Sequence, residues 1–399
     1  MCLVKKGVHS NMNKIFKVVW SKTKECYVVV SEVAKNNGGK KKALASVLAG
    51  LAMVAATAGT PVQASVGLGG SSVNITPDGT YNGSNSVSPN SVVVGYQNDT
   101  RDNTGGNGHI VYGANNKATR DSSLAIGNSN EATAGAATAI GVWSKARGNA
   151  SIAMGNVAMA TATNAIAIGN RANSNAANQE LTSGENSIAI GTQSNAGGGD
   201  SIAIGRQSTT NSVNTVTIGA ETKATGGYAV AIGRESEVNA NFATAMGYQS
   251  KAKGSASIAI GKQNNSNLGD TITMGNSNTA NTMGGIAIGK NNIADSSIGD
   301  PTTATKENSQ IAIGLDNKAT SQDTVAIGRE AESTKTGAVS LGARTKAKGD
   351  YAVAIGSASQ NKTVEAADYA VAVGAMSKAN GDRSVAIGGG AETTAGASR

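Results

Sequence analysis

The chain has 399 residues, of which 52 are glycine, roughly twice the usual ~7%. Aromatic residues make up only 3% and charged residues 15% of the chain. Two Phe and two Trp cannot anchor several ordinary hydrophobic cores, because large aromatic side chains normally supply much of the buried area. The presence of only four prolines excludes a collagen-like or proline-rich chain.

The net charge of +8 is confined to residues 1–64, which hold ten lysines and only two acidic residues, Glu25 and Glu32. The remaining residues, 65–399, hold 24 basic and 24 acidic side chains and are neutral. This distribution gives no electrostatic footprint for a nucleic-acid partner. Both cysteines, Cys2 and Cys26, also lie in the first segment, so no disulfide is expected once that segment is removed.

The first predicted element is a cleavable leader. Lysines 40–42 precede an apolar run over 43–58, and Val62-Gln63-Ala64 ends in a small residue before Ser65. This is the order of a signal peptide, and we expect cleavage between Ala64 and Ser65. The alternative, a retained membrane anchor, is disfavoured because the run is shorter than the ~20 strongly apolar residues that a spanning helix needs.

A further segment precedes this leader and reads MNKIFKVVW, then CYVVVSE, then GGKKKALAS. It resembles the extended signal-peptide region of very large autotransporters and related Gram-negative surface proteins. The resemblance implies that residues 12–64 form an extended signal peptide of type V secretion and that Met12 is the natural start. Residues 1–11 are then an upstream extension.

After residue 90 one short phrase, such as SIAIG, recurs twenty times. Fifteen of the nineteen intervals between its closing glycines are 14 residues long, and the other four are 18, 22, 25 and 18. A fixed period of this kind predicts a solenoid with one coil per repeat. The closing glycines are Gly95, Gly113, Gly127, Gly141, Gly155, Gly169, Gly191, Gly205, Gly219, Gly233, Gly247, Gly261, Gly275, Gly289, Gly314, Gly328, Gly342, Gly356, Gly374 and Gly388.

Each phrase alternates branched and small residues, which predicts a strand with one apolar face. Small residues also recur five and seven positions after each glycine, as at Ala252 and Gly254, and predict a second strand. Stacked in parallel at about 4.8 Å per layer, twenty such coils would form a rod on the order of 95 Å long.

The narrow inside of a two-strand coil admits Ala, Ser or Gly but hardly two isoleucines, so the isoleucines are expected to point outward. An exposed apolar stripe of this length indicates an interface, and burial against copies of the same chain is the simplest solution. This predicted isoleucine ladder comprises Ile188, Ile190, Ile202, Ile204, Ile258, Ile260, Ile286, Ile288, Ile311, Ile313, Val325, Ile327, Val385 and Ile387.

At fourteen-residue spacing the phrases NSIAIG, ASIAMG, DSIAIG and SVAIG resemble the head repeats of YadA-like trimeric autotransporter adhesins over residues 91–395. The resemblance implies an all-β fold, a left-handed parallel β-roll that assembles as a homotrimer with the apolar ladders at its axis. Residues 65–90 would lead into this head. Family members continue through a neck, a coiled-coil stalk and a membrane barrel, so residues 396–399 are expected to be a truncated end without these parts.

Candidate catalytic and cofactor motifs all favour a structural interpretation. Residues 284–290 approach a phosphate-binding loop, but Asn291 replaces the required Ser or Thr. The triple glycine 197–199 opens no expected helix. His109 is the only histidine after the leader, which leaves no basis for a metal cluster or a catalytic triad. We therefore expect no enzyme activity, no cofactor and no metal.

The carboxylate pairs Glu235/Glu237 and Glu330/Glu332 stand beside Arg234 and Arg329 and are expected on a solvated face.

Recognition can reside in two kinds of feature. The long insertions, about 170–187 and 291–310, are loops of the kind on which binding residues concentrate, although decoration without function is an equal alternative. The repeated polar surface could instead meet an extended ligand through many weak contacts. Trp143, just after a strand, is expected either to pack over a turn or to contact a ligand.

The sequence therefore predicts a non-enzymatic adhesin head at the bacterial surface, or a secreted one if the truncation is real. By resemblance its partners are collagen, fibronectin or laminin, or cell-surface molecules in autoagglutination and biofilm formation. A purely structural spacer remains an alternative. A hexapeptide-repeat acyltransferase is disfavoured by the fourteen-residue period and the lone His109.

Overall fold

The computed structural model describes residue 88 and residues 90–101, 107–172, 184–295, 309–359 and 361–393, together with the backbone of three earlier strands. The chain divides into two compact units, residues 1–62 and 63–399. In the first unit β1 (Phe16–Ser21) pairs antiparallel with β2 (Cys26–Ser31). The predicted cleavage site at Ala64 and Ser65 lies outside the described residues.

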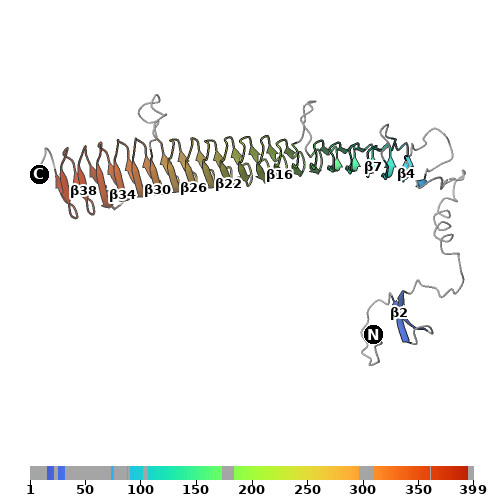
Figure 1. Ribbon diagram of the computed structural model, residues 1–399. Coiled ribbons are helices and arrows are strands. Elements are labelled where there is room, and N and C mark those ends of the chain that lie inside the picture. Colours follow the sequence, from blue (N-terminus) through green and yellow to red (C-terminus); the bar gives the residue numbers. More distant parts are fainter. Residues whose placement is uncertain are drawn as a thin grey trace. The chain divides into compact units, whose positions relative to one another are not determined.

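In the second unit, parallel strands stack into a β-solenoid, one coil after another (Figure 1). The long strands form one sheet, in which each strand pairs with the next from β3 through β40. We call this the long-strand sheet. It consists of β3 (Val73–Ile75), β4 (Val92–Tyr96), β5 (Ile110–Ala114), β7 (Leu124–Asn128), β9 (Thr138–Val142), β11 (Ile152–Asn156), β13 (Ile166–Ile168), β14 (Ile188–Ile190), β16 (Ile202–Ile204), β18 (Val216–Ile218), β20 (Val230–Ile232), β22 (Thr244–Tyr248), β24 (Ile258–Lys262), β26 (Ile272–Asn276), β28 (Ile286–Lys290), β30 (Ile311–Leu315), β32 (Val325–Arg329), β34 (Val339–Ala343), β36 (Val353–Ser357), β38 (Val371–Val373) and β40 (Val385–Ile387).

The second layer consists of strands of only two or three residues, shorter than the sequence pattern suggested. They pair in parallel as a four-stranded and a fourteen-stranded sheet, together called the short-strand layer. Its strands are β6 (Lys117–Ala118), β8 (Glu131–Ala132), β10 (Lys145–Ala146), β12 (Met159–Ala160), β15 (Asn195–Ala196), β17 (Thr209–Thr210), β19 (Lys223–Ala224), β21 (Glu237–Val238), β23 (Lys251–Ala252), β25 (Asn265–Ser266), β27 (Thr279–Ala280), β29 (Ile293–Ala294), β31 (Lys318–Ala319), β33 (Glu332–Ser333), β35 (Thr345–Ala347), β37 (Val364–Ala366), β39 (Lys378–Ala379) and β41 (Glu392–Thr393).

The core between the two layers is built from small side chains, as the repeat predicts. In the coil of β24, Ala259 and Ser257 are 0% exposed, whereas Ile258 and Ile260 are partly exposed on the other face of the strand. Ser266 of β25 closes the core from the opposite layer and donates a hydrogen bond to the Ile258 carbonyl at 2.6 Å. The outward direction of the isoleucines is therefore confirmed. The left hand of the roll stays a prediction.

A ladder of buried asparagines runs inside the coils, three residues after the closing glycine, and was not predicted from the sequence. The Asn278 amide nitrogen donates to Asn264 Oδ1 at 3.0 Å and to the Gly289 carbonyl of the next coil at 2.8 Å. Asn292 repeats the arrangement on Asn278. In coils that lack the asparagine a hydroxyl can replace it, as where Ser250 donates to the Gly261 carbonyl at 2.8 Å. These bonds satisfy buried carbonyls where the long strand turns.

The closing glycine is required by the stacking itself. Gly261 has φ of +120°, and a Cβ built on it would lie 2.1 Å from the carbonyl oxygen of Gly275 in the next coil. No side chain fits there, because the two backbones already touch and the conformation disfavours L residues. This explains why a glycine ends each copy of the repeat.

The insertions leave the long-strand sheet unbroken. β13 pairs with β14, aligning Ile166 with Ile188, and β28 pairs with β30, aligning Ile286 with Ile311. The expected boundaries of the two long insertions, 170–187 and 291–310, were too wide. Residues 170–172 and 184–187 belong to regular coils, as do 291–295 and 309–310, so the extra residues fall within 173–183 and 296–308, outside the described residues.

Candidate ligand-binding surfaces

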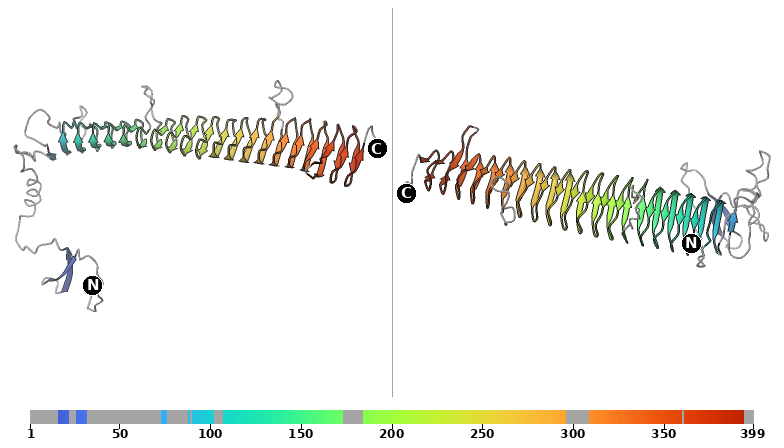
Figure 2. Two further views of the ribbon diagram at one scale, coloured as in Figure 1. Left: turned by 180° about the vertical axis from the view of Figure 1, so that it is seen from behind. Right: turned by 90° about the horizontal axis from the view of Figure 1, so that it is seen from above.

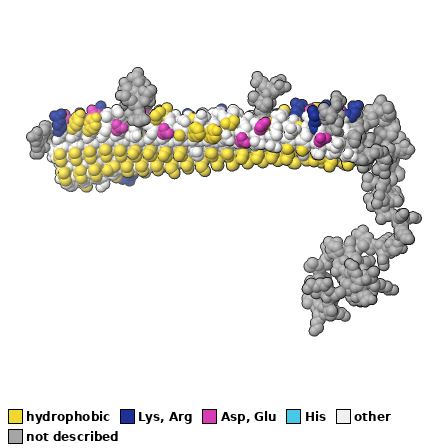
Figure 3. Space-filling model, in the orientation of Figure 1, with side chains coloured by type: hydrophobic (Ala, Val, Ile, Leu, Met, Phe, Trp, Pro, Cys, Tyr) yellow, Lys and Arg dark blue, Asp and Glu magenta, His cyan; other side chains and the backbone are white. Residues whose placement is uncertain are grey.

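The isoleucine ladder covers the outward face of the long-strand sheet. It appears as a continuous apolar band along the lower side in Figure 3. Every predicted member faces outward and none is buried; Val385 and Ile387 in β40, the last described long strand, are 50% and 69% exposed. Register pairing places Ile258 beside Ile272 and Ile260 beside Met274, so the outward side chains form two rows. The row of Ile260 is apolar in every described coil, and the row of Ile258 is interrupted only by Thr138 and Thr244.

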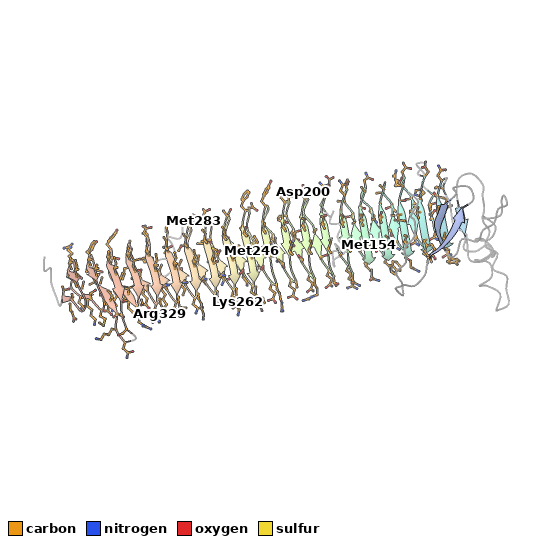
Figure 4. All side chains as sticks on the ribbon, turned by 90° about the horizontal axis from the view of Figure 1, so that it is seen from below. Met154, Asp200, Met246, Lys262, Met283 and Arg329 are labelled. Carbon is orange, nitrogen blue, oxygen red and sulfur yellow. The ribbon has the colours of Figure 1, made fainter. Side chains whose placement is uncertain are left out.

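Several residues of these rows were missing from the predicted set. Met154, Met246 and Met274 occupy the same position as the second isoleucine and are exposed, and Tyr112 does so near the start of the solenoid. Figure 4 shows Met154 and Met246 on the face of the long-strand sheet. The phrase IAMG, which replaces IAIG in one of these coils, was the sequence feature that could have identified them.

In three runs of coils, the outward face of the short-strand layer carries charges that alternate in sign, and the coils between these runs present uncharged residues such as Thr209 and Thr279. Strand pairing places Lys223 beside Glu237 and Glu237 beside Lys251. The same alternation runs from β31 to β41 through Lys318, Glu332, Lys346, Glu365, Lys378 and Glu392. Lys346 Nζ lies 3.0 Å from Glu332 Oε2 and forms an ion pair with it. Because these pairs are partly exposed, each contributes at most about 1 kcal/mol.

A second polar row lies on the turns that follow the long strands, and the two rows enclose shallow grooves. One groove of about 560 Å³ is lined by Glu221, Lys223, Glu235, Glu237 and Gln249 among other polar residues. A second, of about 390 Å³, is lined in part by Glu330, Glu332 and Arg344.

The carboxylate pairs singled out in the sequence therefore lie on a solvated face with basic partners, as expected. Arg344 Nε and Nη2 donate to the two carboxylate oxygens of Glu330 at 2.9 and 3.1 Å. Glu235 lies 2.8 Å from Arg234 and accepts from Gln249 Nε2 at 2.7 Å. Both carboxylates are thus engaged by neighbouring basic or polar side chains.

Two glutamates of the charged face have altered titration. Burial raises the pKa of Glu131, but hydrogen bonds and charge interactions with Arg147 and Lys145 outweigh it and hold the pKa below the ordinary value. At Glu365, burial opposes pairing with Lys348 at 2.7 Å in the same way, and its pKa is again lowered. These ion pairs stabilise the fold above the unfolded-state pKa of the carboxyl, and the contribution is lost as the pH falls through the lowered pKa.

Each long strand is preceded by one turn and followed by another, so the turns line the two sides of the sheet at which the strands begin and end. Figure 4 shows Asp200 and Met283 on the edge that precedes the strands, and Lys262 and Arg329 on the edge that follows them. We call these the leading and trailing turns. Trp143 lies on a trailing turn and is 56% exposed. Its side chain is thus accessible to a ligand.

The remaining candidate sites have structural roles. His109 is fully buried, and its Nδ1 lies 2.8 Å from the Ser123 hydroxyl inside the coil. Residues 286–290 of the phosphate-loop near-match form strand β28 and open no helix. Within the described ranges, no cluster of three His, Cys, Asp or Glu side chains is arranged to hold a metal. The same ranges contain no helix long and apolar enough to cross a membrane.

Comparison with known families matches both parts of the chain. A model described as the extended signal peptide of the type V secretion system matches residues 12–59. A model described as the YadA head domain repeat matches seven segments, residues 132–158, 183–208, 211–236, 239–264, 311–331, 333–359 and 366–391. The chain belongs to the YadA-like trimeric autotransporter adhesins. No curated protein matches it in a sequence search.

The YadA-head assignment fits the coil geometry. Each matched segment spans about two coils, and the gaps between segments include both long insertions. The strands β4 to β7 lie before the first matched segment, yet they continue the same pairing. The head-repeat architecture therefore extends over the whole stacked series, which both views in Figure 2 show as continuous from cyan to red.

Proposed function

We propose that this YadA-like head is a non-enzymatic surface adhesin that binds host extracellular matrix, host cells or other microbes. The observation that carries the proposal is the contrast between the two faces of the solenoid: one is apolar in almost every coil, and the other carries polar or charged side chains over most of its length. The apolar face suits self-assembly. The polar lattice suits an extended ligand met through many weak contacts.

We further propose that three copies assemble with their isoleucine ladders at a common axis. A face with two long rows of apolar side chains, one of them interrupted only by Thr138 and Thr244, far exceeds the scattered exposure that an isolated soluble chain tolerates. Membership of a trimeric family supports the number three. The candidate ligands are collagen, fibronectin and laminin on the matrix side and surface molecules of neighbouring cells on the other.

Binding is tested with two shortened heads. Deleting eight residues within 173–183 restores the 14-residue spacing between Gly169 and Gly191, and deleting residues 248–275 removes two complete coils. If the repeated face binds, we expect the first head to adhere to immobilised matrix proteins and cells as before. The second should adhere more weakly through lost avidity. Circular dichroism and light scattering confirm that both retain β-structure and assembly.

The opposite pattern would assign recognition to the insertion: the first head would lose adhesion while its mass and β-content persist. A head that adheres to no matrix protein and no cell would instead favour the structural spacer.

Export is expected to remove the leader between Ala64 and Ser65. The match to the type V signal peptide ends at residue 59, just before this site, and Val62 and Ala64 are small residues in the positions that signal peptidase reads. Mass spectrometry of material recovered outside the cytoplasm should find Ser65 at the N-terminus. Recovery of residues 12–64 on the mature protein would contradict this.

A further inference from the structure

The residue five positions before each closing glycine lies at the tip of a leading turn, where its side chain stacks on those of the neighbouring coils. In two adjacent coils this residue is aromatic. The rings of Tyr228 and Phe242 stack with centroids 5.2 Å apart and planes 11° from parallel. Their side chains are 57% and 62% exposed. The centroid spacing is close to the strand spacing, so the turns themselves set the stack.

A second stack at the same position in later coils shows what can follow two aromatic rings. Tyr351 and Tyr369 stack with centroids 5.4 Å apart. The guanidinium of Arg383, from the next coil, lies 5.7 Å from the Tyr369 ring centroid. The row thus reads aromatic, aromatic, arginine, and a cation covers the outer ring face.

The first row lacks this cation. In the next coil the equivalent turn residue is Ala256, and in the coil after that it is Asp270. Ala256 and Asp270 are both exposed, and both keep the backbone geometry of the row, with φ of 53° and 55°. Alanine is too short to cover the ring of Phe242. Within the described ranges, the Asp270 carboxylate forms no ion pair.

We propose that the space above Ala256 is a binding site for an arginine side chain of a partner protein. The guanidinium stacks on Phe242 as Arg383 stacks on Tyr369, and it pairs with the carboxylate of Asp270. The dimensions agree: Phe242 and Asp270 lie two layers apart, about 10 Å along the axis, which leaves one layer for a planar group.

The chemistry selects arginine over other side chains. A planar guanidinium can stack on a ring face and still donate its N–H groups to a neighbouring carboxylate, whereas an ammonium is a compact, strongly hydrated point charge. A neutral aromatic ring would leave Asp270 without a counter-charge. An acidic group would be repelled by it.

The inference rests on the proposed function in one respect: the arginine belongs to a molecule that the head binds. It is tested without that molecule. The probe is N-acetyl-arginine amide, titrated into the assembled full chain and followed by ligand-observed NMR, with N-acetyl-lysine amide as the probe for charge alone.

We expect the arginine amide to bind more tightly than the lysine amide. Phe242→Ala and Asp270→Asn should each weaken arginine binding about two- to five-fold, the range of an exposed cation–π contact or ion pair. Ala256→Arg should abolish binding, because the introduced side chain fills the site as Arg383 does in the second row.

Asp323→Asn is the matched control. Asp323 occupies the same position of a leading turn, with φ of 54°, but Gly337 and Ser309 are its neighbours along the row. Removing this charge should leave arginine binding unchanged. Equal binding of the two amides, equal loss in the Asp323 variant, or no binding because a neighbouring subunit covers Phe242 would each overturn the inference.

Adhesion measured in parallel separates this outcome from the proposed function. A head that adheres to matrix or cells but discriminates neither amide refutes only the arginine site. A head that binds the arginine amide but adheres to nothing refutes only the adhesin.

Discussion

Gly261→Ala is expected to destabilise the solenoid by about 3 kcal/mol or more, because it combines a strained backbone with overpacking. The new Cβ would meet the Gly275 carbonyl oxygen at 2.1 Å and the Asn264 amide nitrogen at 2.9 Å. Neither atom can retreat, since the carbonyl belongs to the stacked backbone and the amide to the buried ladder. Because each coil contacts only its neighbours, the loss should be greatest in the coils around residue 261. Hydrogen exchange along the chain would locate it.

Gly269→Ala provides the comparison within the next leading turn. A Cβ at Gly269 would find its nearest neighbour, the Ser255 carbonyl oxygen, at 3.5 Å, an ordinary contact distance. This variant should melt within a few degrees of the unmodified head. If both variants melt at the same temperature as the parent, the close approach of successive glycines does not limit the fold.

Ile260→Lys is expected to dissociate the proposed trimer. In the single chain Ile260 faces outward between Met246 and Met274, so a lysine there is harmless until the subunits meet. In the assembly three ammonium groups would face one another in a desolvated interface, at a cost of several kcal/mol in order of magnitude. Light scattering and sedimentation should show a lower mass at concentrations where the parent remains assembled.

Thr279→Lys tests whether any added lysine has this effect. Thr279 also faces outward and is partly buried, but it belongs to β27 in the short-strand layer, between Asn265 and Ile293. This variant should keep the mass of the parent. A well-folded monomer for the unmodified head, or an undiminished trimer for the Ile260→Lys variant, would contradict the role of the isoleucine ladder.

The fold was predictable because one period determines it. Fourteen residues with alternating branched and small side chains leave a core too narrow for isoleucine, and this alone predicts that Ile258 and Ile260 point outward. The buried asparagines escaped prediction for a physical reason. Polar residues such as Asn264 and Asn278, just after a turn glycine, have the composition of a solvated loop. Only the stacking of coils shows that each amide meets the carbonyl of the next closing glycine.

The candidate binding surfaces were predictable only in part. The solvated carboxylates at Glu235 and Glu330 followed from their basic neighbours. The sequence left open whether Trp143 packs over a turn or faces a ligand, and its exposure of 56% came from the structure. The aromatic stack did not, because Tyr228 and Phe242 lie in separate turns and nothing local indicates that they touch. The two rings touch only because strand pairing aligns their turns in successive coils. The same alignment places the short side chain of Ala256 next to Phe242.

The tolerance of the coils for inserted segments has a consequence for the length of the head. Ile166 pairs with Ile188 and Ile286 with Ile311 in the same register as residues fourteen positions apart. Strand pairing is therefore kept whatever the length of the segment between two coils. A change that adds or deletes a whole fourteen-residue repeat therefore leaves the pairing of the remaining coils intact, and the head still closes. The length of the solenoid can thus change in steps of about 4.8 Å without altering which faces it presents.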